Sequence, residues 1–214
     1  IGAGNSETRG GSINVLGGDS ISSTGGSVYI SSGKSRTGRS GKLTISSSAG
    51  SGSGNVLFST GASSSSSGNM RISSGISDGD SGSIFFSLGD SKGKGGNVQI
   101  SSGSSMSDSS GSIKIFSGES GVSLGGSVIL QAGSSEENSG GDIAIMSGVG
   151  REYSGEIYIG TSIKDISRRS GDINVATGDA IDSSGDISVA TGDTKFGNSG
   201  KVTISSGKSE LSIG

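Results

Sequence analysis

The 214-residue sequence contains no proline, cysteine, histidine or tryptophan. Without histidine and cysteine, it excludes Ser-His and Cys-His catalysis and the zinc sites built on those side chains. No apolar run is long enough to span a bilayer. The 16 basic and 19 acidic residues leave a nearly neutral chain, without the basic patch that nucleic acids require. We therefore expect a protein without enzymatic activity, cofactor, nucleic-acid partner or membrane span.

Glycine and serine dominate what is present, with 44 glycines in the chain. Such a composition is typical of flexible linkers or disordered segments. The absence of proline and the regular placement of apolar residues favour ordered repeats instead. The clearest example is the stretch 170–179, Ser-Gly-Asp-Ile-Asn-Val-Ala-Thr-Gly-Asp, which returns with one substitution at 184–193.

One glycine marks the start of each repeat, two residues before the first apolar residue, and we call it the anchor. The fourteen anchors recur about every 14.5 residues, a short period typical of solenoids. They are Gly11, Gly26, Gly41, Gly54, Gly68, Gly82, Gly96, Gly111, Gly126, Gly141, Gly155, Gly171, Gly185 and Gly200.

The second and fourth positions after every anchor are apolar, and most are β-branched. Apolar residues that alternate with period two predict a strand with one buried face. The sixth position is small in nearly every repeat, and the seventh is glycine in twelve of the fourteen, Ser48 and Ser162 being the departures. We expect the seventh residue to need a positive φ where the chain leaves the strand. Variable polar loops separate the strands.

A strand with one apolar face cannot bury it alone, so successive repeats are expected to stack. The predicted fold is all-β: one parallel β-solenoid over residues 1–214, open at both ends, with fourteen one-strand repeats. Two strands per coil is the preferred arrangement, because Tyr29, Leu57 and Phe85 then form one outward column; three per coil is the alternative. The expected core ladder includes Ile13, Val15, Val28, Ile30, Ile84, Phe86, Ile143, Ile145, Ile173, Val175, Ile187 and Val189.

Four consecutive repeats carry an acidic residue at the first position, and stacking would bring these like charges together. These residues are Asp142, Glu156, Asp172 and Asp186. Compensation by the loop residues Arg151, Lys164, Arg168 and Arg169 is one interpretation. A bound Ca²⁺ along the column is the other, and thermal stability during a calcium titration distinguishes the two.

The repeats resemble the Ser/Gly-rich parallel β-solenoid repeats of secreted surface, fibre and adhesin-type proteins. Such repeats occur in algal or diatom-like proteins and in bacterial proteins. The unit at 110–118, Ser-Gly-Ser-Ile-Lys-Ile-Phe-Ser-Gly, carries the resemblance. The resemblance implies an extracellular or cell-surface rod. The calcium-binding β-roll family is a weaker match, because its Gly-Gly-x-Gly-x-Asp motif is missing.

Two functions are compatible with this interpretation. The first is a structural protein of an extracellular filament or sheath, which self-associates end to end and laterally, with Tyr29, Leu57 and Phe85 as lateral contacts. The second is an adhesin stalk or a module that binds glycans or a surface. The dense loop serines of a secreted rod are also possible sites for O-linked sugars. The whole interpretation depends on the aliphatic side chains lying in a dry column, and coordinates that place them in water would contradict it.

Overall fold

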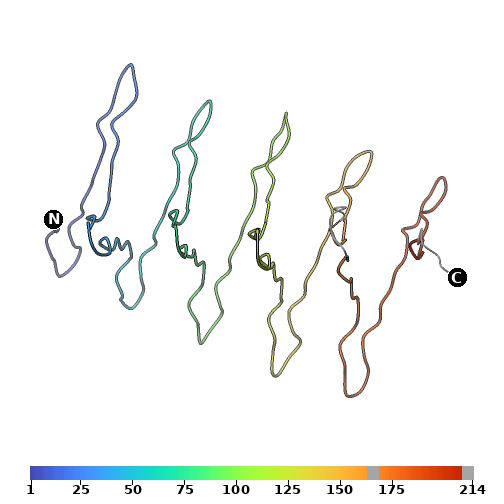
Figure 1. The fold of residues 1–214 in the computed structure, drawn as a ribbon. Coiled ribbons are helices and arrows are strands. Elements are labelled where there is room, and N and C mark those ends of the chain that lie inside the picture. Colours follow the sequence, from blue (N-terminus) through green and yellow to red (C-terminus); the bar gives the residue numbers. More distant parts are fainter. Residues whose placement is uncertain (163–168, 209–214) are drawn as a thin grey trace. The chain divides into compact units, whose positions relative to one another are not determined.

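The computed structural model describes residues 1–162 and 169–208 (Figure 1). Within these ranges the chain forms no helix and no strand. The predicted parallel β-solenoid is therefore wrong: the described chain consists of extended segments and loops without a hydrogen-bonded sheet. Among the same residues, no helix is long and apolar enough to cross a membrane.

The chain divides into two units, Ile1–Ser101 and Ser102–Gly214. The division falls inside the repeat that begins at Gly96, and the repeat pattern of the sequence continues across it. The same local structure occurs within each unit. Every bend in the described chain lies in a loop, and none lies between an anchor glycine and its seventh position.

Backbone hydrogen bonds close many of the loops at their two ends. In each, the amide of an anchor glycine donates to the carbonyl oxygen of the seventh-position glycine before it. Three such bonds lie in the first unit and four in the second, with N···O distances of 2.7–3.0 Å. The donor–acceptor pairs are Gly11–Gly4, Gly26–Gly18, Gly41–Gly33, Gly111–Gly103, Gly126–Gly118, Gly141–Gly133 and Gly155–Gly148.

This closure is the physical reason why consecutive segments do not stack in parallel. Two parallel neighbouring strands need a connection of roughly a dozen residues or more, whereas a short loop joins segments that run in opposite directions. Here the closing bonds join residues only seven or eight positions apart in the sequence. Figure 1 shows the chain turning back on itself at successive loops.

Close contact, rather than backbone angle, is what restricts many of the anchor positions to glycine. A Cβ added to an anchor would lie within 4.0 Å of the sixth-position residue of the preceding repeat at all fourteen anchors. At Gly126, for example, it would lie 3.2 Å from both the Ser117 Cβ and the Gly118 amide nitrogen. The contact therefore favours glycine at the closely approached anchors, whereas at Gly54 and Gly68 the added Cβ would be in ordinary van der Waals contact.

The prediction for the seventh position is wrong. Among the described residues, Gly197 in a loop is the one residue with a positive φ, at 100°. The seventh-position glycines therefore keep ordinary backbone angles, and a Cβ on Gly118 or Gly133 would meet no atom within 4 Å. Their carbonyl oxygen, rather than their conformational freedom, is what the closed loop uses.

No side chain in the described part of the chain is buried. The total accessible surface is 22814 Å², against about 9,000 Å² for a folded monomer of this mass and about 30,000 Å² for its unfolded chain. All twelve residues of the expected core ladder are exposed, from Ile84 at 45% to Phe86 at 76%. No second layer covers the apolar face of these segments, which is the physical reason why a core is missing from the described structure.

Alanine at an anchor should open its loop, whereas alanine at the neighbouring seventh position should not. In Gly126→Ala, the added methyl group pushes residue 126 away from Gly118, so we expect its amide to exchange hydrogen several-fold faster than in the wild type. Gly118→Ala removes the same kind of residue but places its methyl group in open space, and serves as the matched control. Residue-resolved hydrogen exchange by NMR makes the measurement. Equal exchange in the two variants would contradict the close-contact explanation.

Candidate assembly surface

A serine two residues after the seventh-position glycine organises the turn of most loops. Its hydroxyl oxygen accepts a hydrogen bond from a backbone amide two or three residues later, at 2.9–3.4 Å. Such serine turns give the backbone a local partner in place of a sheet. The nine serines are Ser6, Ser20, Ser35, Ser63, Ser77, Ser91, Ser105, Ser120 and Ser135.

Sequence reasoning missed these serines because serine is abundant throughout the loops. The signal that identifies them is their fixed distance from the seventh-position glycine. Thr194 occupies the equivalent place in its own loop, where its hydroxyl donates to the Phe196 carbonyl oxygen at 2.9 Å. The loops are therefore short turns with a repeated internal structure, although their sequences vary.

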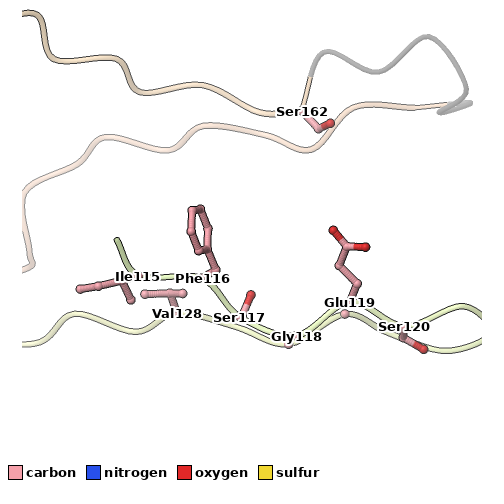
Figure 2. Close-up of a pocket in the computed structure, with 10 residues that line it drawn as sticks. Ile115, Phe116, Ser117, Gly118, Glu119, Ser120, Val128 and Ser162 are labelled. Carbon is pink, nitrogen blue, oxygen red and sulfur yellow. The ribbon is translucent and has the colours of Figure 1, made fainter. Parts of the chain in front are cut away.

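Apolar side chains of consecutive repeats come together on either side of a loop. Phe58, at a fourth position, lines a small apolar hollow with Met70 and Ile72 of the next repeat. In the second unit, Ile115 is at a fourth position and Val128 is at the second position of the next repeat. The two lie side by side in Figure 2. Each group is a local cluster of two or three side chains that remain exposed to solvent.

The hollow drawn in Figure 2 offers no catalytic arrangement. Phe116 and Glu119 project into the same open space, and Ser162 lines it from another segment of the unit. Among its described lining residues, Glu119 is the one ionisable side chain. General acid–base catalysis by carboxylates needs a second group near the first. The described residues of this hollow are mostly serine and glycine, with Ile115, Phe116 and Val128 as the apolar part.

Exposure varies regularly along each repeat. The second position is 45–63% exposed, and in every repeat it is less exposed than the fourth. The third position points away from both: Tyr29, Leu57 and Phe85 are 91%, 84% and 87% exposed. The alternation expected for an extended segment with one apolar face is therefore present within each repeat. The two apolar positions of the fourteen repeats, 28 side chains in all, form what we call the assembly surface.

The acidic residues of the expected column are all exposed. Within residues 1–162 and 169–208, no three acidic side chains come together in a group that could hold a metal ion. Asp142, Glu156, Asp172 and Asp186 are thus not gathered by the described chain. Of the four basic residues that could compensate them, Lys164 and Arg168 lie outside the described residues. Calcium binding stays a prediction.

Removing a turn serine should loosen its loop while leaving the rest of the repeat unchanged. In the second unit, the Ser135 hydroxyl accepts from the Asn138 amide at 3.0 Å. We expect Ser135→Ala to increase hydrogen exchange at the Asn138 amide about fivefold, because the loss of one such bond costs about 1 kcal/mol. Ser134→Ala in the same loop is the matched control. An unchanged Asn138 amide in Ser135→Ala would contradict the role given to the turn serines.

Comparisons with models of protein families, with curated proteins and with solved structures find no match to this chain. No family or fold is therefore transferred to it from a relative. The chain itself presents a repeated surface: fourteen short apolar segments separated by polar loops, seven of which are closed by a backbone hydrogen bond.

Proposed function

We propose that this chain is a non-enzymatic structural protein that self-associates through the assembly surface and belongs to an extracellular filament or sheath. The observation that supports this function is the repeated exposure of 28 apolar side chains at two fixed positions of fourteen repeats. Isolated exposed apolar residues are normal on any protein. A regular array of them is typical of an interaction surface.

The amount of exposed surface supports an extensive contact. The chain exposes more than twice the area expected for a folded monomer of its mass. The excess is on the order of 10,000 Å², whereas a standard protein–protein interface buries about 1,200–2,000 Å² in total. The chain as a whole therefore exposes enough area for contacts along its length.

A second copy is the partner that fits this surface best. The apolar segments recur about every 14.5 residues, so a partner must present apolar segments at the same spacing to cover many of them at once. Another copy of the chain has that spacing because it has the same sequence. The small net charge of −3 gives little overall repulsion between copies.

The loops complete this proposal. Their serines are exposed, and they keep a polar surface around each apolar segment. We propose that some carry O-linked sugars, consistent with the extracellular location that the sequence resemblance implies. Loop peptides released from protein isolated from its source should then have masses above those of the bare sequence. Loop peptides that all have the bare mass would contradict this part of the proposal.

Self-association should depend on apolar residues of the segments and not on apolar residues of the loops. In the variant Ile143→Ser/Ile173→Ser/Ile187→Ser, three second-position side chains are lost. The matched control Ile21→Ser/Ile76→Ser/Ile181→Ser removes three isoleucines that lie in loops and are fully exposed. We expect the first variant to raise the concentration needed for assembly at least tenfold, because about 1.5–3 kcal/mol is lost for each apolar side chain that becomes buried on association.

Sedimentation velocity over a concentration series measures this threshold, and negative-stain electron microscopy shows the product. Long uniform fibres from the wild type and the loop control are the expected result. A wild-type chain that remains monomeric at every concentration would contradict the proposed function. Equal loss of assembly in both variants would contradict the role of the assembly surface.

A further inference from the structure

Charge is distributed unevenly along the chain. The first unit contains eight basic and five acidic residues, whereas the second contains eight basic and fourteen acidic residues. The contrast is sharper in two stretches. Residues 20–77 include five basic residues and no acidic one, and residues 170–194 include five aspartates and no basic residue. The two stretches therefore carry formal charges of opposite sign and equal size.

Four of the five basic residues in the stretch 20–77 lie at one closed loop. Lys34, Arg36 and Arg39 fall within the loop 33–41, and Lys42 directly follows it. The loop is closed by the Gly41 amide, which donates to the Gly33 carbonyl oxygen at 2.8 Å. Its turn is held by the Ser35 hydroxyl, which accepts from the Gly38 amide at 2.9 Å. All four cationic side chains are exposed. We call residues 33–42 the basic loop.

The negative charge is spread over one and a half repeats. Asp172 and Asp186 occupy the first positions of two consecutive segments, next to the apolar residues of the assembly surface. Asp179, Asp182 and Asp193 lie in the adjoining loops. All five are exposed. We call residues 172–193 the acidic segment.

We propose that the basic loop of one copy docks against the acidic segment of a second copy. This inference rests on the proposed self-association and names which parts of two copies meet. Charge complementarity supports it: pairing like with like would place four cations against four cations, or five carboxylates against five, at every contact. Pairing the basic loop with the acidic segment places opposite charges against each other instead. The apolar segments that associate lie next to this contact.

The contact is heterologous, because its two surfaces belong to different parts of the sequence. Each copy in a pair therefore keeps one basic loop or one acidic segment free for a further copy. A heterologous contact that does not close into a ring grows into an open chain of subunits. Exposed charges are screened by salt within about 10 Å at 0.1 M ionic strength. The charges thus select the pairing and speed the encounter, while the apolar segments hold the copies together.

Charge reversal of each surface tests this pairing. The first variant is Lys34→Glu/Arg36→Glu/Arg39→Glu, and the second is Asp172→Lys/Asp179→Lys/Asp182→Lys. Each opposes like charges at the proposed contact, so we expect each alone to associate about tenfold more slowly than the wild type at low ionic strength. An equimolar mixture should recover much of the rate, because the acidic loop of one variant meets the basic segment of the other.

The variant Lys92→Glu/Lys94→Glu/Lys114→Glu is the matched control for the first variant, because it changes the net charge by the same amount outside both surfaces. Light scattering after dilution from denaturant follows the rate for all samples, at low and at high salt. The control should associate at nearly the wild-type rate, and high salt should remove the difference between the variants and the wild type.

Three results would overturn the pairing: reversal variants that associate as fast as the control, a mixture no faster than its components, or an effect that persists unchanged in high salt. In each of these the wild type still assembles, so the proposed function stands without this contact. A wild type that never assembles removes both. Binding of a sulfated polysaccharide to the wild type, with self-association insensitive to reversal, would assign the basic loop to a different ligand and also overturn the pairing.

Discussion

The structure depends on one hydrogen bond, repeated along the chain, between an anchor glycine amide and the carbonyl oxygen of the glycine seven or eight residues earlier. In seven of the loops it fixes where the loop begins and ends. It also brings the anchor so close to the preceding segment that a side chain larger than hydrogen does not fit without a shift at sites such as Gly126. The turn serines support the same loops from within. Backbone bonding here is local, and no ladder between distant segments is present in the described residues.

Sequence reasoning located the repeats, because a period of about 14.5 residues is visible in glycine and in isoleucine or valine alike. It also placed the bends correctly, since loop composition signals turns. It failed on how the segments associate. Residues such as Ile13 and Val15 show that one face of a segment is apolar, but the same alternation suits any arrangement that covers this face. It also misjudged the seventh glycine, whose carbonyl oxygen matters more than its freedom of φ, and it overlooked turn serines such as Ser35.

The proposed function is based on the apolar surface that the loops do not cover. They organise the polar half of each repeat within one chain, whereas the aliphatic half is only partly shielded, by neighbours such as Phe58 and Met70 that remain in contact with water. An exposed apolar surface of this size is typical of an interaction site. Because the same short unit is presented many times, weak contacts at single repeats add up along the chain, as they do in multivalent binding.

The short span of each closing bond also determines how a single copy loses its order. In stacked repeat proteins, interfaces between neighbouring units couple their unfolding into one transition. Loops of this length close in about 10–100 ns and need no distant partner, so each opens and recloses independently of the others. Heating an isolated copy should therefore melt the loops one by one over a broad temperature range, without the single sharp transition of a stacked repeat array.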